Sequence, residues 1–214
     1  MNLNNFTRLP ILGIARGIVP EDLEPLVLTV IDAGLEAFEI TMNTKGAAEL
    51  IKRAKNIAGG KLAIGAGTVL TKKDLEAAVS AGASFIVMPV IIEDVIKKCV
   101  KENIPVFPGA LTPNEVLRAW ELGATMVKVF PANAFGPKYI KELKGPLNRV
   151  KLMAVAGVTK DNIPDYFASG ADAVAFGGSI FGRELFDKKD FGTIGREVRA
   201  MVDKVRKIAG ESKG

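Results

Sequence analysis

Residues 113–131, PNEVLRAWELGATMVKVFP, contain the unit from which the fold is inferred. The first half begins at Pro113 and has helical spacing, and Gly123 ends it as the residue type that most readily adopts a left-handed helix stop. The second half, residues 126–131, is a short run rich in Val and Phe, typical of a buried strand. The stretch therefore predicts a helix followed closely by a strand.

The same unit recurs along the chain. Glycines at the expected helix ends are Gly34, Gly82, Gly123 and Gly170, at spacings of 48, 41 and 47 residues. Strands are expected near 10–16, 37–42, 62–68, 85–89, 105–109, 126–131, 151–156 and 173–177. Helices are expected to begin near Pro20, Gly46, Thr71, Ile92, Pro113, Gly136, Asp161 and Thr193. Eight strand–helix units predict an α/β fold, a (β/α)8 TIM barrel formed as a single domain by residues 1–214. An open doubly wound sheet has the same alternation and is the alternative.

Composition excludes several classes of protein. No apolar run approaches the ~20 residues of a membrane span, and residues 1–5 lack the basic and apolar regions of a signal peptide. The chain has one cysteine, Cys99, on the apolar face of a predicted helix, where packing is its expected role. A single cysteine forms no internal disulfide, so we expect a cytoplasmic protein that does not bind membranes.

The charged residues give a net charge of +5 without a concentrated basic patch. The densest basic stretch, residues 196–207, alternates with Val198, Val202 and Val205 at helical spacing. We interpret it as the solvated face of a terminal helix, with nucleic-acid binding as the less favoured alternative. The chain has no histidine, which removes the commonest general base and the commonest zinc ligand. We therefore expect no metal site, and acid–base chemistry by carboxylate, lysine or tyrosine.

Lys128 lies in the middle of the predicted strand 126–131, where burial makes an ammonium costly. A buried lysine tends to lose its proton, and a neutral amine in an apolar pocket forms imines with carbonyl substrates. The alternatives are a lysine on an edge strand, or one whose side chain extends out of the strand end into water.

Two further charged residues are expected near Lys128. In strand 37–42 the side chains of Ala37, Glu39 and Thr41 share one face, which suits a barrel interior, so Glu39 is expected to face Lys128. The two would shift each other's pKa and exchange protons through water. Arg16, ending the first strand, is a candidate cation for a carboxylate or phosphate. Alternatively, Glu39 forms a structural ion pair, with Arg16 as one possible partner.

Small residues at other strand ends are candidates for ligand contacts. Active sites of such barrels lie at the carboxyl ends of the strands, and exposed backbone N–H groups there often bind phosphate. Gly157 follows the seventh strand, and Gly177, Gly178 and Ser179 follow the eighth. Thr68 places a hydroxyl at the end of the third strand.

These motifs together resemble the 2-keto-3-deoxy-6-phosphogluconate and 4-hydroxy-2-oxoglutarate aldolase family, which includes a 2-keto-3-deoxy-6-phosphogalactonate branch. The resemblance runs from about Pro10 to Phe181. It rests on GIARG (13–17), FEIT (38–41), GAGTV (65–69), VMP (87–89), FPGALTP (107–113), VKVFPA (127–132) and FGGS (176–179).

The resemblance implies a class I aldolase that cleaves a 2-keto-3-deoxy-6-phospho-sugar acid to pyruvate and D-glyceraldehyde 3-phosphate. Lys128 would form the Schiff base and Glu39 would relay protons. Thr68 would hold the carboxylate and Pro89 would shape the pyruvyl pocket. Residues implied to receive the phosphate are Gly157, Gly177, Gly178 and Ser179. It also implies a homotrimer that needs no metal or organic cofactor.

Two departures bear on the substrate. Many phosphogluconate aldolases have an arginine at the place of Asn43, and Thr-Gly-Gly at the place of Val155-Ala156-Gly157. Asn43, Val155 and residues 134–141 resemble the phosphogalactonate branch, which favours a galactonate-type pocket. The methyl group of Ala156 is expected to crowd a phosphate. Two alternatives remain: a 4-hydroxy-2-oxoglutarate aldolase producing glyoxylate, and a non-catalytic phosphate-binding barrel or assembly subunit.

Overall fold

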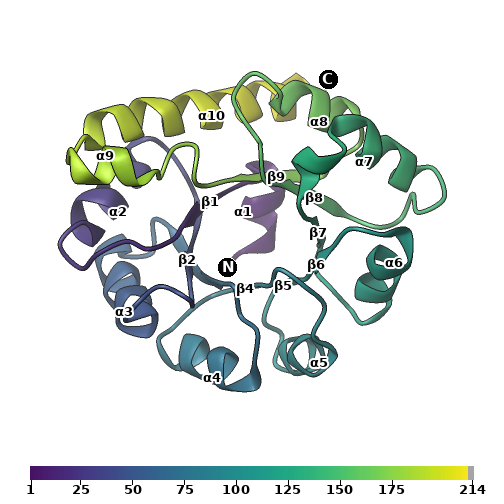
Figure 1. The fold of residues 1–214 in the computed structure, drawn as a ribbon, viewed down its shortest axis with the longest axis horizontal. Helices are drawn as coiled ribbons and strands as arrows, with labels where there is room; N and C mark the ends of the chain where they lie inside the picture. The colour runs from purple at the N-terminus through teal and green to yellow at the C-terminus, as the bar shows by residue number, and fades with distance from the viewer. Residues whose placement is uncertain (212–214) are drawn as a thin grey trace.

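The structure, a computed structural model, describes residues 1–211, which form a parallel β-barrel surrounded by helices (Figure 1). The strands in this range are β1 (Ile11–Ala15), β2 (Ala37–Thr41), β3 (Ala63–Gly67), β4 (Ile86–Val87), β5 (Val106–Phe107), β6 (Gly109–Ala110), β7 (Val127–Val129), β8 (Leu152–Val155) and β9 (Ala173–Phe176). The helices are α1 (Leu3–Arg8), α2 (Leu23–Asp32), α3 (Ala47–Ala58), α4 (Lys72–Ser80), α5 (Glu93–Lys101), α6 (Pro113–Glu121), α7 (Pro137–Lys144), α8 (Ile163–Ala168), α9 (Arg183–Asp187) and α10 (Phe191–Glu211), with a 3-10 helix η1 at Ala132–Ala134.

The strand order confirms the predicted barrel and excludes the open sheet. The order is β5-β4-β3-β2-β1-β9-β8-β7-β6, and all the pairs are parallel. Its two ends, β5 and β6, are separated in sequence by Pro108 alone. They are halves of one interrupted strand, so the sheet closes on itself. The last three residues of the domain predicted over 1–214 lie outside the described range.

Three local predictions were incomplete. The fifth strand, predicted over 105–109, is divided at Pro108, which has no N–H for the ladder. Helix α1 and helix α9 were not predicted at all. Both are shorter than two turns, and α1 buries only Phe6, so neither has an extended apolar stripe.

The predicted helix-stop glycines all take the left-handed conformation, with φ of +83° at Gly34, +90° at Gly82, +92° at Gly123 and +94° at Gly170. After α2 the N–H of Gly34 donates to the carbonyl of Ile31, and that of Leu35 to the carbonyl of Val30. This pairing satisfies carbonyls that the helix end leaves free, and it turns the chain back toward the barrel. The internal repeat therefore has a structural basis.

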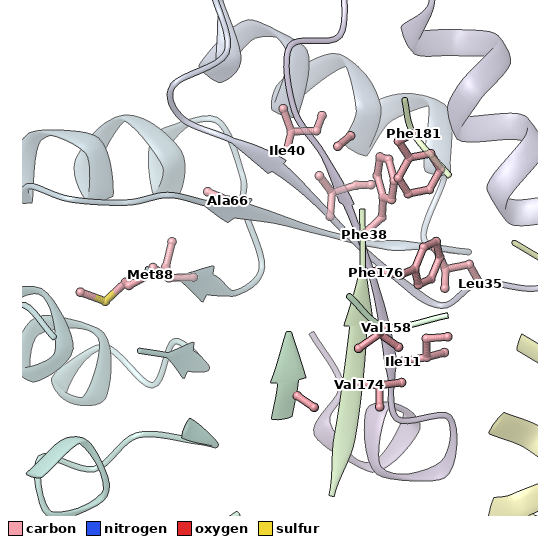
Figure 2. Packing of buried hydrophobic residues seen from close by; sticks show 14 of the residues in the cluster. Ile11, Leu35, Phe38, Ile40, Ala66, Met88, Val158, Val174, Phe176 and Phe181 are labelled. Carbon is pink, nitrogen blue, oxygen red and sulfur yellow. The ribbon is translucent and has the colours of Figure 1, made fainter. Parts of the chain in front are cut away.

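The core has two layers, separated by the strands. Phe38 and Ile40 of β2 point outward and pack under the helices, where Phe181 contacts the ring of Phe38 edge-on at 5.5 Å between centroids (Figure 2). Ala37 of the same strand belongs to the barrel interior with Phe85 and other inward residues. The alternation predicted for 37–42 is thus confirmed.

Helix α1 closes the amino end of the barrel. In Figure 1 it lies across the middle of the ring of strands. Its Phe6 enters the interior, 5.7 Å from the ring of Phe107, and the ammonium of Met1 donates to the carbonyl of Ser84 just before β4. The rings of Phe6, Phe85 and Phe107 thus pack together inside the amino end of the barrel.

The remaining expectations for the helices hold. Cys99 is buried on the inner face of α5. The valines at 198, 202 and 205 are buried on α10, while the basic residues between them face outward. No helix in residues 1–211 is long and apolar enough to cross a membrane.

Candidate active site

A cavity of about 370 Å³ opens at the carboxyl end of the barrel, around Lys128 and Glu39. Its wall includes eight of the eleven residues predicted for the site: Arg16, Glu39, Lys128, Val155, Gly157, Gly177, Gly178 and Ser179. They lie on β2, β7 and β8 and in the segments that follow β1, β8 and β9. Larger hollows of about 540 and 550 Å³ lie around α1 at the amino end, but neither Lys128 nor Glu39 lines them.

Lys128 is an interior lysine. It lies on β7 between β6 and β8, with Gly109 and Met153 as its neighbours in the ladder, and it is 7% exposed. Burial lowers the pKa of its ammonium, the charge of Glu39 opposes that effect, and the charge of Arg16 adds to it. Its Nζ lies 4.8 Å from the ring centroid of Phe130. The edge-strand and solvent-extended alternatives are wrong, and the amine is placed for nucleophilic chemistry.

Glu39 is 1% exposed on the inner face of β2. Burial raises its pKa from an ordinary 4.5 to about 7, against the opposing charges of Lys128 and Arg16. Within the described residues its Oε2 accepts no hydrogen bond, and it forms no ion pair with Arg16 or any other cation. The structural ion pair that was the alternative for Glu39 is therefore absent from residues 1–211, and a carboxyl with a pKa near neutrality can both accept and return protons.

Gly67 on β3 makes room for the Glu39 carboxyl. A Cβ at this position would lie 2.1 Å from Oε1 of Glu39 and 3.2 Å from Cγ2 of Thr41. Any larger residue would displace the acid. The GAGT motif indicated close packing or ligand approach at these glycines, but only the structure identifies Glu39 as the neighbour.

Small residues form another part of the cavity wall. Gly157 has a φ of +68°, and a Cβ on it would lie 2.5 Å from Cβ of Asn133. Gly178 has no atom within 4 Å of where its Cβ would stand, so its backbone faces open space. Backbone N–H groups next to absent side chains can approach an anion closely. Ala156 has a φ of +84°, a conformation that favours glycine.

Three predicted site residues are not in the cavity wall. Asn43 is exposed beyond the end of β2. Thr68 follows β3 with a φ of +55° and is half-buried. Pro89 is also half-buried, and its carbonyl oxygen would lie 2.2 Å from a Cβ on Gly109, so it packs against β6 instead. Their assigned roles remain predictions.

Two buried hydroxyls, not recognised in the sequence, hold the segment after β1. The N–H of Gly17, next to Arg16, donates to Oγ1 of Thr44 at 2.9 Å. That oxygen is hydrogen-bonded at 3.1 Å to Oγ1 of Thr41, which shares the inner face of β2 with Glu39. The position of Arg16 is thereby tied to the strand that carries the acid.

Comparisons with known proteins agree with this geometry. The model of the family described as KDPG and KHG aldolase matches residues 3–197. A 2-dehydro-3-deoxy-6-phosphogalactonate aldolase of Escherichia coli K12 is 38% identical over 176 residues, covering 82% of this chain and 86% of its own. A 2-dehydro-3-deoxy-phosphogluconate aldolase of Haemophilus influenzae is 37% identical over 188 residues, covering 87% and 88%.

Solved structures show the same fold. A structure described as native KDPGal superposes with a TM-score of 0.88 at 34% identity, covering 95% of this chain and 97% of its own. A KDPG aldolase from Legionella pneumophila, with pyruvate captured as a covalent carbinolamine, superposes with a TM-score of 0.85 at 26% identity, covering 92% and 96%. This chain belongs to the KDPG and KHG aldolase family.

Proposed function

We propose that this protein is a class I aldolase that cleaves a 2-keto-3-deoxy-6-phospho-sugar acid to pyruvate and D-glyceraldehyde 3-phosphate. The observation that carries the proposal is the burial of Lys128 and Glu39 together, in the wall of one cavity that is also lined by glycines. The amine, the acid and the bare backbone suit the ketone, the hydroxyl protons and the phosphate of such a substrate.

The reaction begins at Lys128. Its neutral Nζ attacks the C2 ketone, and the resulting carbinolamine loses water to give a protonated imine. Removal of the proton from the C4 hydroxyl allows the C3–C4 bond to break, and its electron pair moves into the enamine. Glyceraldehyde 3-phosphate leaves, C3 takes up a proton, and water hydrolyses the imine to release pyruvate.

Glu39 is the proton relay in these steps. With a pKa raised to about 7 by burial, it can give a proton to the departing hydroxide of the carbinolamine and take one from the C4 hydroxyl, directly or through water. Its unpartnered Oε2 leaves an acceptor free for this purpose.

The substrate's two anionic groups are assigned to different sets of residues. The phosphate lies against the backbone of Gly157, Gly177 and Gly178 and the hydroxyl of Ser179, and Arg16 supplies positive charge beside them. Thr68 and Pro89 are proposed to bound the carboxylate end. Asn43 and Val155 support the galactonate-type substrate, whose C4 hydroxyl has the opposite configuration to that of the gluconate type.

The decisive experiment is borohydride reduction in the presence of pyruvate, followed by peptide mass mapping. We expect a reduced pyruvate adduct on Lys128 in the wild-type protein and none in folded Lys128→Met. Absence of an adduct in folded wild-type protein would contradict the aldolase proposal and favour a phosphate-binding barrel without lysine catalysis.

The substrate is then identified by comparing kcat/KM for both C4 epimers and for 4-hydroxy-2-oxoglutarate. We expect the galactonate-type compound to be cleaved fastest. Equal activity on the compound without phosphate would instead support the aldolase that produces glyoxylate.

We further propose that the chain acts as a cytoplasmic homotrimer. Two large apolar side chains near the carboxyl end of the barrel, Phe135 and Val90, are 61% and 50% exposed in the single chain, as expected where subunits meet. A designed protein cage built by fusing symmetric oligomeric domains has a TM-score of 0.86 at 35% identity, and covers 96% of this chain and 74% of its own. Light scattering after gel filtration should give three times the monomer mass; a monomer would contradict the proposal.

A further inference from the structure

Asp22 is a buried carboxylate outside the cavity. Its side chain is 4% exposed, and its one partner in the described chain is Lys189, whose Nζ contacts Oδ1 although the two residues are 167 positions apart in sequence. A carboxylate this deeply buried is costly unless it is paired, so the contact with Lys189 holds the two segments together.

Lys189 occupies a place that usually belongs to glycine. It ends α9 with a φ of +52°, its N–H donates to the carbonyl of Phe186, and the N–H of Asp190 donates to that of Leu185. Gly34 and Gly123 occupy the same position after α2 and α6. A side chain is disfavoured there, and the ion pair with Asp22 gives a physical reason for a lysine in place of glycine.

The two partners end the two segments that border the phosphate side of the cavity. Asp22 ends the segment after β1, which begins with Arg16 and is held at its start by Thr44. Lys189 ends the segment after β9, which begins with Gly177 and includes α9. Strands β1 and β9 are neighbours in the barrel, and Figure 1 shows α9 beside α2.

We propose that the Asp22–Lys189 ion pair is a positioning device for the phosphate end of the substrate. It ties together the far ends of the segments that carry Arg16 and the glycines at 177 and 178, adding to the β1–β9 pairing that joins the starts of these segments. The inference rests on the proposed function, since it assigns a phosphate to this side of the cavity. Neither partner lines the cavity, so both act through other residues.

The test compares Lys189→Met with Lys188→Met, in the full-length chain. Each variant removes one exposed ammonium from neighbouring positions, but the ion-pair partner of Lys188 within residues 1–211 is Glu184 on its own helix. For Lys189→Met we expect KM for the phosphorylated substrate to rise roughly tenfold with kcat little changed, because remote binding is lost while the reacting atoms stay in place. For Lys188→Met we expect wild-type values.

Two further variants separate positioning from folding. Asp22→Asn keeps an acceptor for Lys189 but removes the buried charge. It should raise KM for the phosphorylated substrate, as Lys189→Met does. Lys189→Gly removes the pair while relieving the left-handed backbone, so it should raise KM without a comparable loss of thermal stability.

Pyruvate trapping by borohydride distinguishes the two proposals. We expect all of these variants to trap pyruvate on Lys128 as the wild-type protein does, because pyruvate has no phosphate. A KM in Lys189→Met equal to that in Lys188→Met would overturn the positioning role. Loss of trapping in Lys189→Met alone would overturn it too, by indicating general disruption of the site. Failure of wild-type protein to trap pyruvate would instead count against the proposed function.

Discussion

The two ends of the barrel interior are built in opposite ways. At the amino end the rings of Phe6, Phe85 and Phe107 fill the space, with centroid separations of 5.7 and 6.0 Å between successive rings. At the carboxyl end Glu39 and Lys128 are equally buried, yet they face a cavity, and one Glu39 oxygen has no partner within residues 1–211. The amino end is packed with aromatic rings, whereas the carboxyl end has buried polar side chains that face a cavity.

This contrast indicates that the fold gains stability at the amino end of the barrel and loses some at the carboxyl end. At the amino end, aromatic contacts add to the free energy gained by burial. At the carboxyl end, burial raises the pKa of Glu39 and lowers that of Lys128, because it penalises the charged form of each group. Substitutions at the two ends should therefore separate stability from activity.

The largest expected effect is that of Lys128→Met. Methionine matches the apolar stem of lysine and lacks the amine, so kcat/KM should fall roughly 10⁵-fold. The free energy of unfolding should stay the same or increase, because a costly buried amine is lost. Activity assays and urea unfolding check both halves. Residual turnover above one-thousandth of wild type would contradict the imine mechanism.

The opposite pattern is expected for Phe6→Ala at the amino end. Removing a buried ring should lower the free energy of unfolding by about 3–5 kcal/mol, with kcat unchanged at temperatures where the variant is folded. Leu3→Ala on the same helix is the control, since Leu3 is 41% exposed and should cost little. A fall in kcat as large as the fall in stability would mean that the two ends are not independent.

Glu39→Gln is expected to lose turnover and yet to be more stable than the wild type at high pH. Because the pKa of Glu39 is raised from 4.5 to about 7, the folded protein holds a proton that the unfolded chain has lost between these pH values. Wild-type stability should thus fall as pH rises through this window, by about 3 kcal/mol relative to the glutamine variant. Urea unfolding at pH 5 and pH 8 measures the difference, and turnover should be lost while imine formation persists. A stability difference that is the same at both pH values would show that the acid does not titrate there.

Two glycines on one strand allow a matched comparison of the two ends. Gly67→Ala should displace Glu39 and lower kcat about 100-fold. Gly65→Ala would place its Cβ 2.3 Å from the Phe85 ring, so it should cost stability while the folded fraction remains active. Equal kcat values for the two variants would remove the positioning role of Gly67.

The smallest expected effect is that of Ala156→Gly. Its left-handed backbone penalises a side chain by about 1 kcal/mol, and the greater freedom of glycine in the unfolded chain returns part of the gain. Stability should rise by less than 1 kcal/mol, with KM for the phosphorylated substrate slightly lower. The control, Ala154→Gly on β8, is buried with ordinary backbone angles and should lose stability. A loss in both variants would mean that the strain at Ala156 is compensated elsewhere.

Most of the fold could be predicted because its signals are local. The short apolar runs locate the strands, with β5 and β6 falling in one predicted run, and the glycine stops explain why four of the helices turn back where they do. Helix α1 could not be predicted, because its position depends on Phe6 entering a cavity that the strands create only after they close. The break at Pro108 has a local cause, but the rule that proline interrupts a ladder does not say whether the strand ends or continues.

The candidate site also has a part that local sequence predicts and a part that only the structure shows. Lys128 and Glu39 followed from strand alternation, which is a property of neighbours in sequence. The contact of Gly67 with Glu39 depends on the register between β2 and β3, and the Asp22–Lys189 ion pair joins residues 167 positions apart. Neither contact can be predicted from the spacing of residues in the sequence, so the structure was needed to identify both.

Pro108 has a consequence for how the barrel moves. Strand β4 pairs with β3 at one position and with β5 at two, whereas β2 pairs with β3 at five. With a proline between β5 and β6, this side has fewer paired ladder positions than β1 to β3, and we expect its amides to exchange with deuterium earliest in any local opening. Since Lys128 is paired with Gly109 of β6, it lies beside this less extensively paired part of the wall. The barrel thus combines a more extensively paired side, β1 to β3, that includes the strand of Glu39 with a less extensively paired side that borders Lys128.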